Sequence, residues 1–313
     1  MFPLGYPLLV SRAIFRGVLL RRCVRLQSGK SRSSSQNKWL DRQSNDHYTK
    51  EAKLQDFKSR AAFKLIEIDD KFQLFKRNQH QSILDLGFAP GAWSQVARMR
   101  SNENSVILGV DILACKPPKG VNSIQANILS KKTQEYIRWF FRDNFNLNRV
   151  DTLDKVKGFL HDDDNNITNN NSQDATSPEN FENTVRSRYP VDVIVSDMYD
   201  ISSPNTGYWN NLTNMPYYRL ANTTGIKIKD HEQSIDLCDA ALVTAIDLLK
   251  PGGAFVCKIY TGKSDADFKR RLRHVFNKVA SFKPLASRQE SKETYFVGLQ
   301  KKANVDKLKV FTE

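Results

Sequence analysis

Residues 82–97, SILDLGFAPGAWSQVA, constrain the fold of this chain more than any other segment. An apolar strand runs into a turn rich in glycine and proline, and a helix-forming stretch follows directly. Gly87 and Gly91 let the backbone come close to a ligand, and the exposed amides at the start of the helix favour polar ligand atoms. The segment predicts a nucleotide-cofactor loop, although an ordinary strand-to-helix turn would have the same pattern.

The turn does not fit a dinucleotide cofactor. The glycine fingerprint for NAD also requires glycine at positions 89 and 92, where this chain has Ala89 and Ala92. The next apolar run, SVILGVD, ends in Asp111 about twenty residues further on, where a carboxylate can accept hydrogen bonds from both hydroxyls of a ribose. The turn and the acid at the strand end together indicate a nucleotide cofactor other than NAD.

Strand and helix patterns alternate along most of the chain. The apolar runs predict strands at 82–86, 105–110, 191–196, 253–259 and 294–299. Helices are expected at 92–100, 131–142, 232–250 and 265–279. Such alternation predicts an α/β fold with a mostly parallel sheet flanked by helices, built as a single domain from residue 36 to residue 313.

Four charged residues stand at the edges of these segments. Lys64 ends the segment KSRAAFK, and Asp197 ends VDVIVSD. Lys258 interrupts the apolar run GGAFVCKIY, and Glu293 begins ETYFVGLQ. Taken singly, such charges are most often solvated at the rim of a domain. Lys258 fits that interpretation least, because its apolar run is typical of a strand covered on both faces. If the four converge, the cost of desolvating them implies a working site, one that could deprotonate a sugar hydroxyl.

Several motifs occur in the order and at the spacing found in a known family. They are SRAAFKL, DLGFAPGAW, SDM, LKPGGAFVCKIY and SRQESKETYFVGL, and the match runs from about residue 37 to residue 301 with one interruption. In these motifs the chain resembles the FtsJ family of S-adenosylmethionine-dependent RNA ribose 2′-O-methyltransferases. The resemblance implies a Rossmann-like methyltransferase fold, S-adenosylmethionine as the cofactor and RNA as the substrate.

The resemblance also implies roles for individual residues. The family's catalytic tetrad of Lys, Asp, Lys and Glu falls on Lys64, Asp197, Lys258 and Glu293. Its cofactor contacts fall on Gly91, Trp93, Asp111, Asn127 and Asp197, and Gly87 belongs to the same loop. Lys258 is expected to be the general base, which requires a neutral amine. Burial and a nearby Lys64 would favour the neutral form, whereas Asp197 and Glu293 would oppose it and orient the amine.

The expected partner is ribosomal RNA, in the large mitochondrial ribosomal subunit or its precursor. The resemblance implies this because the nearest members of the family methylate a uridine of large-subunit rRNA. A tRNA ribose methyltransferase is an alternative, since the tetrad is shared. A second alternative is an rRNA-binding ribosome assembly factor with weak or no methyltransferase activity. Two departures from the family pattern prompt it, namely Asn127 in place of an aspartate, and Tyr199 and Asp200 in place of alanine and proline.

The first 35 residues have the composition of a mitochondrial transit peptide. They are rich in arginine, end in a serine-rich stretch and contain no acidic residue. The first 40 residues carry 8 basic side chains, so the net charge of +14 less 8 leaves +6 for the remainder, an excess compatible with phosphate binding. The apolar stretch of the leader is too short to span a membrane. A location in the mitochondrial matrix is expected, with a secretory signal as the rival interpretation.

Cysteine and histidine give no sign of a metal site. The chain has 4 cysteines and 5 histidines, without a CxxC pair or metal-ligand spacing. No periodic apolar surface predicts an obligate dimer, so a monomer is expected. RNA contacts are instead predicted at two basic stretches and one aromatic group: Lys269, Arg270, Arg271 and Arg273; residues 283–292; and Tyr199, Tyr208, Trp209, Tyr217 and Tyr218. A solvated helix face is the alternative for the first stretch.

Residues 151–187 form a polar, asparagine-rich interruption. Because such a segment cannot offset its ordering entropy by burying apolar surface, we predict a flexible surface insertion, with a partner-binding loop as the alternative. Deleting residues 162–180 should therefore leave the midpoint of thermal unfolding, followed by circular dichroism, close to that of the full chain. A collapse of thermal stability would show that the segment packs on the domain.

Overall fold

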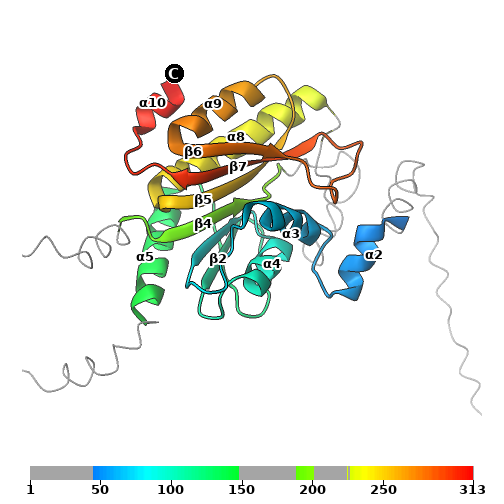
Figure 1. Ribbon diagram of the computed structural model, residues 1–313, viewed down its shortest axis with the longest axis horizontal. Coiled ribbons are helices and arrows are strands. Elements are labelled where there is room, and N and C mark those ends of the chain that lie inside the picture. The colour runs from blue at the N-terminus through cyan, green and yellow to red at the C-terminus, as the bar shows by residue number, and fades with distance from the viewer. Residues whose placement is uncertain (1–44, 148–187, 201–223, 225, 313) are drawn as a thin grey trace, which may run out of the picture. The chain divides into compact units, whose positions relative to one another are not determined.

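The computed structural model describes residues 45–147, 188–200, 224 and 226–312, and Figure 1 shows their arrangement. The strands form one seven-stranded sheet in the order β3-β2-β1-β4-β5-β7-β6. Their bounds are β1 (Ser82–Leu86), β2 (Val106–Asp111), β3 (Asn122–Gln125), β4 (Val191–Ser196), β5 (Leu249–Tyr260), β6 (Phe276–Phe282) and β7 (Glu293–Lys301). The helices are α2 (His47–Leu54), α3 (Ala61–Phe72), α4 (Ala92–Arg100), α5 (Lys131–Leu147), α8 (Lys227–Leu248), α9 (Asp265–Val275) and α10 (Lys307–Thr312).

The strand order reverses between β1 and β4. β1 pairs in parallel with both β2 and β4, and β3 and β5 extend these parallel pairs on either side. The carboxyl ends of β1 to β5 therefore share one edge of the sheet. β7 runs antiparallel to β5 and to β6. Open α/β sheets bind their ligands beside the carboxyl ends at such a reversal, which here is the edge next to residues 87–91 and 197.

Helices cover both faces of the sheet, and alternate residues of each strand face opposite cores. Ile83 of β1 is buried in the core that contains α3 and α4. Its neighbour Leu84 is buried in the core that contains α5, α8, α9 and α10. The near-continuous burial of β1, β2 and β4 follows from cover on both faces, which is why their sequences are apolar runs rather than alternating patterns.

The predicted fold class is confirmed, with a mostly parallel sheet flanked by helices. The strands predicted at 82–86 and 191–196 have the predicted bounds, and β5 begins at Leu249, earlier than predicted. The helix predicted at 265–279 is wrong beyond Val275, because β6 begins at Phe276. Apolar residues continue at helical spacing through this boundary, which hides the change of structure. β3 was not predicted, since its four residues, NSIQ, include no fully buried side chain.

Two predicted segments lie outside the described residues. They are the transit peptide at 1–35 and the insertion at 151–187. Among the helices that the structure describes, none combines the length and the apolar character needed to cross a bilayer.

Gly298 in β7 lies against the ring of Phe276. A methyl group added at Gly298 would lie 2.5 Å from Cδ2 of that ring, which itself stacks on Phe255 with 5.7 Å between ring centroids. Gly298→Ala should lower the free energy of unfolding by about 1–3 kcal/mol, because overpacking forces the ring or the strand to move. Urea unfolding measures the loss. The double variant Gly298→Ala/Phe276→Ala removes the ring atoms that the methyl would meet, so its loss of stability should be smaller than the sum of the two single losses; additive losses would contradict this explanation.

Candidate active site

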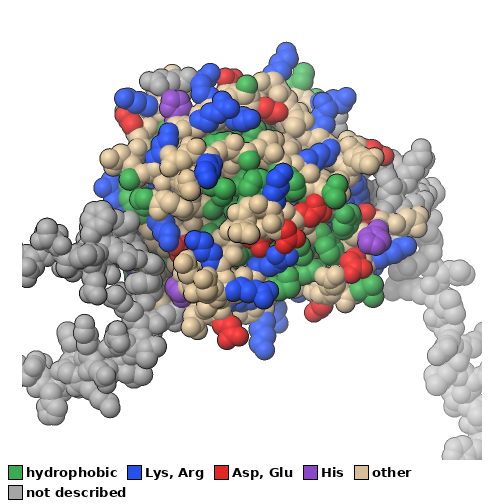
Figure 2. Space-filling view, in the orientation of Figure 1, with side chains coloured by type: hydrophobic (Ala, Val, Ile, Leu, Met, Phe, Trp, Pro, Cys, Tyr) green, Lys and Arg blue, Asp and Glu red, His purple; other side chains and the backbone are tan. Residues whose placement is uncertain are grey.

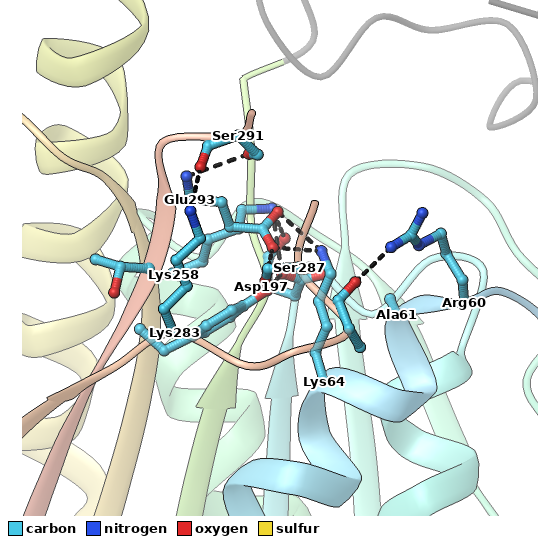
Figure 3. Close-up of polar contacts among 12 residues, drawn as sticks. Arg60, Ala61, Lys64, Asp197, Lys258, Lys283, Ser287, Ser291 and Glu293 are labelled. Carbon is cyan, nitrogen blue, oxygen red and sulfur yellow. Dashed lines mark hydrogen bonds and ion pairs between the residues drawn. The ribbon is translucent and has the colours of Figure 1, made fainter. Parts of the chain in front are cut away.

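The structure brings the four charged residues together at the carboxyl edge of the sheet (Figure 3). Lys64 Nζ lies 2.7 and 2.8 Å from the two carboxylate oxygens of Glu293. Lys258 Nζ lies 3.2 Å from Oδ1 of Asp197. Two lysines and two carboxylates thus form two ion pairs, each drawn from segments far apart in the sequence.

Sheet register explains this convergence. β4 and β5 are parallel neighbours, and their register places Asp197, the residue after β4, beside Lys258. β7 is antiparallel to β5, so its first residue, Glu293, reaches the edge at which β5 ends. α3 packs on one face of the sheet and supplies Lys64. An antiparallel strand is required here, because a parallel β7 would begin at the opposite edge.

Lys258 is buried, at 4 % exposure, and its amine has several partners. Nζ donates to the backbone oxygen of Asp197 at 2.6 Å and lies 4.9 Å from the centre of the Tyr199 ring. The hydroxyl of Tyr295 donates to Oδ1 of Asp197 at 3.0 Å. Burial, and then the charge of Asp197, raises the pKa of Tyr295 well above its usual range, so this hydroxyl remains a donor. These contacts fix the position of the Asp197 carboxylate and, through it, the amine.

Glu293 is the more buried of the two carboxylates in the ion pairs, at 6 % exposure. Ser287 Oγ donates to its Oε1 at 2.7 Å, in addition to the contacts from Lys64. Burial by itself would raise the pKa of Glu293, but the charges of Lys64 and Lys258 outweigh it and lower the pKa below its usual range. Glu293 therefore remains ionised near neutral pH and holds Lys64 in place.

α3 also holds the loop that leads into β7. The carboxylate of Glu67 accepts hydrogen bonds from the backbone N–H groups of Leu285 and Ala286, the second at 2.8 Å. The guanidinium of Arg60 donates to the backbone oxygen of Ala286. The same helix carries Lys64 and is hydrogen-bonded to the loop that precedes Glu293. The two residues of the Lys64–Glu293 pair are therefore fixed relative to each other.

The loop between β1 and α4 needs both of its glycines. Gly87 has φ +72°, and a methyl group there would lie 2.5 Å from Cγ of Met198. Gly91 has φ +103°, and a methyl group there would lie 2.9 Å from the ring of Pro118. Gly91 is the N-cap of α4 and provides no side-chain cap, so the first amides of the helix are available to a ligand. The packing of the protein itself therefore requires glycine at both positions, and a cofactor bound close to this backbone would require it as well.

Asp111 ends β2 next to this loop. Its two carboxylate oxygens accept hydrogen bonds from the backbone N–H groups of Ala89 and Leu113, both at 2.9 Å. Burial raises the pKa of Asp111, and the backbone amides partly offset that rise. Each oxygen keeps a lone pair for a ribose hydroxyl. Asn127, after β3, is exposed, and its side-chain oxygen accepts from the N–H of Leu129 at 3.0 Å.

The indole of Trp93 has a different position from the other predicted cofactor residues. It is 3 % exposed and donates to the backbone oxygen of Ala61 at 2.9 Å. Its ring packs near Tyr295, with 5.6 Å between centroids. The side chain therefore joins α3, α4 and β7 in the core beneath the site, and a contact with a cofactor is left to the backbone amide of Trp93.

Comparisons with known proteins agree with this geometry. The family model described as FtsJ-like methyltransferase matches residues 57–301, which include both ion pairs and the glycine loop. This chain is a member of the FtsJ-like methyltransferase family. It is therefore an enzyme, a methyltransferase.

Relatives of this FtsJ-like methyltransferase span most of its length. It is 58 % identical to rRNA methyltransferase 2, mitochondrial, of Saccharomyces cerevisiae, over 90 % of this chain and 92 % of the relative. The protein of the same name in Schizosaccharomyces pombe is 34 % identical, over 84 % and 95 %. Ribosomal RNA large subunit methyltransferase E of Rickettsia canadensis is 32 % identical, over 89 % and 95 %.

Sequence reasoning missed some residues at the site of this FtsJ-like methyltransferase. Asp85 in β1 is fully buried, accepts a hydrogen bond from Ser94 Oγ at 2.6 Å, and has one oxygen without a partner among the described residues. Ile112 and Leu129 are 58 % and 68 % exposed, beside the strand-end residues Asp111 and Asn127. The sequence contained a sign of each residue. Asp85 is an acid inside an apolar strand, and Ile112 and Leu129 are apolar residues in loops that follow strands.

The predicted RNA-contacting groups are only partly described. Tyr199 lies against Lys258, whereas Tyr208, Trp209, Tyr217 and Tyr218 lie outside the described residues. In the first basic stretch, Arg270 pairs with the exposed Asp267 of the same helix at 3.2 Å, whereas the half-buried Arg271 pairs with Asp239 of α8. Lysine and arginine side chains are spread over the face in Figure 2 and form no continuous patch there. Among the described residues, no group of His, Cys, Asp and Glu side chains is arranged to hold a metal ion.

The buried Asp85 gives this FtsJ-like methyltransferase a distinct pH dependence of stability. Burial raises the pKa of Asp85 to about 7, only partly offset by Ser94. In the unfolded chain the value is about 3.9, so the folded protein binds the proton more tightly. Wild type should therefore lose stability relative to Asp85→Asn as the pH rises from about 4 to about 7, by no more than about 4 kcal/mol, with no further change above.

Urea unfolding at several pH values measures this difference. Ser94→Ala removes the donor that favours the charged carboxylate, so it should raise the pKa of Asp85 further and extend the loss of stability to higher pH. Stability curves of wild type and Asp85→Asn that stay parallel from pH about 4 to about 8 would contradict the account.

Proposed function

We propose that this chain transfers the methyl group of S-adenosylmethionine to the 2′-oxygen of a uridine ribose in mitochondrial large-subunit ribosomal RNA. The observation that carries the proposal is the meeting of two buried ion pairs with the glycine loop at one edge of the sheet. A ribose hydroxyl is a weak nucleophile until its proton is removed, so an enzyme for this reaction needs a base and alignment. The site offers both.

The residues around the glycine loop fit S-adenosylmethionine. Asp111 keeps lone pairs for the two ribose hydroxyls, and the uncapped first amides of α4 suit polar ligand atoms. The exposed Ile112 and Leu129 offer apolar surface for an adenine ring. The side-chain amide of Asn127 can bond to the adenine edge. When bound, this cofactor supplies a methyl group that is activated by the positive charge on sulfur.

Lys258 is the proposed general base. As a neutral amine it accepts the proton of the 2′-hydroxyl, and the resulting ammonium is stabilised by Asp197 and the ring of Tyr199. Asp197, held by Tyr295, orients the amine. The ammonium group of Lys64, held in place by Glu293, is the proposed positive charge that stabilises the negative charge developing on the 2′-oxygen.

The substrate and the location are inferred from the relatives and from the leader. The two yeast relatives described above are named as mitochondrial rRNA methyltransferases, and the bacterial relative is named for the large ribosomal subunit. The acid-free, arginine-rich leader supports import, with the matrix as the destination. A uridine as the target follows from the resemblance to the rRNA-methylating members of the family.

Replacing the base should remove the chemistry and spare the cofactor site. Lys258→Ala should lower the single-turnover rate of methyl transfer to a large-subunit rRNA transcript by about a thousandfold or more, within the range for loss of a general base. The dissociation constant for S-adenosylmethionine, measured by calorimetry, should change only a few fold. Near wild-type turnover would remove Lys258 from this role.

Lys250→Ala is the matched control, because Lys250 lies on the same strand and pairs with Asp192 at the opposite edge of the sheet. It should retain methyl transfer. Asp197→Ala should lose it, since the amine then lacks its orienting carboxylate. An assembly factor that binds rRNA without modifying it would give no methyl incorporation even in the wild type, and would overturn the proposal.

A further inference from the structure

A cavity of about 290 Å³ opens at the edge of the sheet opposite the active site. Its lining includes Tyr189, which lies just before β4, the end of β7, the middle of α5, the end of α8 and the start of α10. β4 is 6 residues long, which corresponds to about 20 Å between this edge and Asp197. The cavity is thus a separate site from the methyltransferase centre.

Positive charge gathers in this cavity. Its lining includes four cationic side chains and one acid: Arg138, Arg188, Lys301, Lys307 and Asp247. Lys307 Nζ pairs with the Asp247 carboxylate at 2.7 Å, which leaves the guanidinium groups of Arg138 and Arg188 and the buried amine of Lys301 without an acidic partner in the lining. Like charges around a partly enclosed space repel one another, so the arrangement favours a bound anion.

Lys301 is the most buried of these cations, at 4 % exposure. Its amine donates to the backbone oxygens of Ile246 and Leu249, at 2.7 and 2.6 Å, and lies 4.3 Å from the centre of the Tyr189 ring. Burial is the main cause that lowers its pKa to about 7, and Arg188 lowers it further while Asp247 opposes the shift. Lys301 thus caps the end of α8, which explains its presence without any ligand.

Capping of α8 explains the other cations only in part. Arg138 donates to the backbone oxygen of Asp247 at 3.3 Å, but its Nε is buried with no hydrogen-bond partner among the described residues. The guanidinium of Arg188 lies 5.4 Å from the centre of the Tyr189 ring, the same ring that Lys301 contacts. A buried N–H group without an acceptor costs free energy, and an oxyanion in the cavity would satisfy it.

We propose that this cavity binds a phosphate group. The planar forks of two guanidinium groups match the oxygens of a phosphate better than a spherical halide ion. The lysine ammonium groups act as point charges and require no particular bonding geometry. A phosphodiester of the RNA substrate and free inorganic phosphate share this chemistry. The RNA source rests on the proposed function, whereas binding of a phosphate group to the cavity does not.

An RNA strand has a suitable surface between the two sites. α5 begins just after Asn127 at the active-site edge and brings Arg138 to the cavity. The same helix exposes Tyr136 and Trp139, which flank Arg138 in the sequence, at 42 % and 58 %, with 5.8 Å between their ring centroids. Exposed aromatic side chains beside cations are the means by which proteins stack unpaired bases. A segment of rRNA remote from the target nucleotide is therefore the occupant that the surroundings favour.

The test removes two cations that are not needed for packing. In Arg188→Gln/Lys307→Gln, affinity for a large-subunit rRNA transcript, measured by filter binding, should fall by about tenfold, and the slope of log affinity against log salt should fall by about 1. The control Lys278→Gln/Lys309→Gln removes the same charge from exposed positions outside the cavity and should leave the salt slope near that of wild type. Thermal unfolding checks that both variants fold.

Titration with inorganic phosphate by calorimetry separates the two sources. Loss of rRNA affinity in the cavity variant but not in the control supports an RNA phosphodiester. Unchanged rRNA affinity with loss of inorganic phosphate binding supports a site for free phosphate. If the cavity variant and the control match wild type in both measurements, the proposal is overturned. Methyl transfer to a short RNA fragment is measured in parallel, so a failure of the proposed methylation is seen independently of these binding results.

Discussion

The structure depends on keeping four charges out of water at one edge of the sheet. An unpaired buried charge costs several kcal/mol, and removing one partner of a buried pair costs about 3–5 kcal/mol. Here each lysine meets a carboxylate, and the paired oxygens Oε1 of Glu293 and Oδ1 of Asp197 also accept from Ser287 and Tyr295. The site is therefore tolerated because each charge has a partner of opposite sign, and the fold has to bring all four to one place.

The sheet topology meets that requirement in two ways. Parallel β4 and β5 deliver Asp197 and Lys258 side by side at their carboxyl ends, beside the glycine loop after β1. Antiparallel β7 delivers Glu293 to the same edge from the other direction, and α3 grips both Glu293 and the loop before it. The opposite edge of the sheet contains a second buried lysine, Lys301, whose partners are backbone carbonyls at the end of α8 rather than carboxylates. The lysines of the active site are therefore neutralised by carboxylates, whereas Lys301 lies in a cavity that keeps an excess of positive charge.

Much of this arrangement could be predicted from the sequence, for identifiable reasons. Strands covered on both faces are apolar runs, so β1 and β4 were located with their bounds, and the polar residues that end such runs pointed to the site. Prediction was poorer where the pattern is ambiguous. β3 is short and half exposed, and β6 continues the apolar spacing of α9. Contacts between distant segments also escaped prediction: the burial of the Trp93 indole, the grip of Glu67 on the loop before β7, and the cavity around Lys301. Each depends on tertiary packing that no local pattern encodes.

The central claim is that the amine of Lys258 lies within reach of the reacting hydroxyl. A crystal structure with S-adenosylhomocysteine and an RNA fragment that contains the target ribose tests it most directly. The account predicts that the 2′-oxygen lies about 2.6–3.2 Å from Lys258 Nζ, with Asp197 still in contact with the amine. A 2′-oxygen bound instead beyond the reach of Lys258, next to another titratable group, would contradict it.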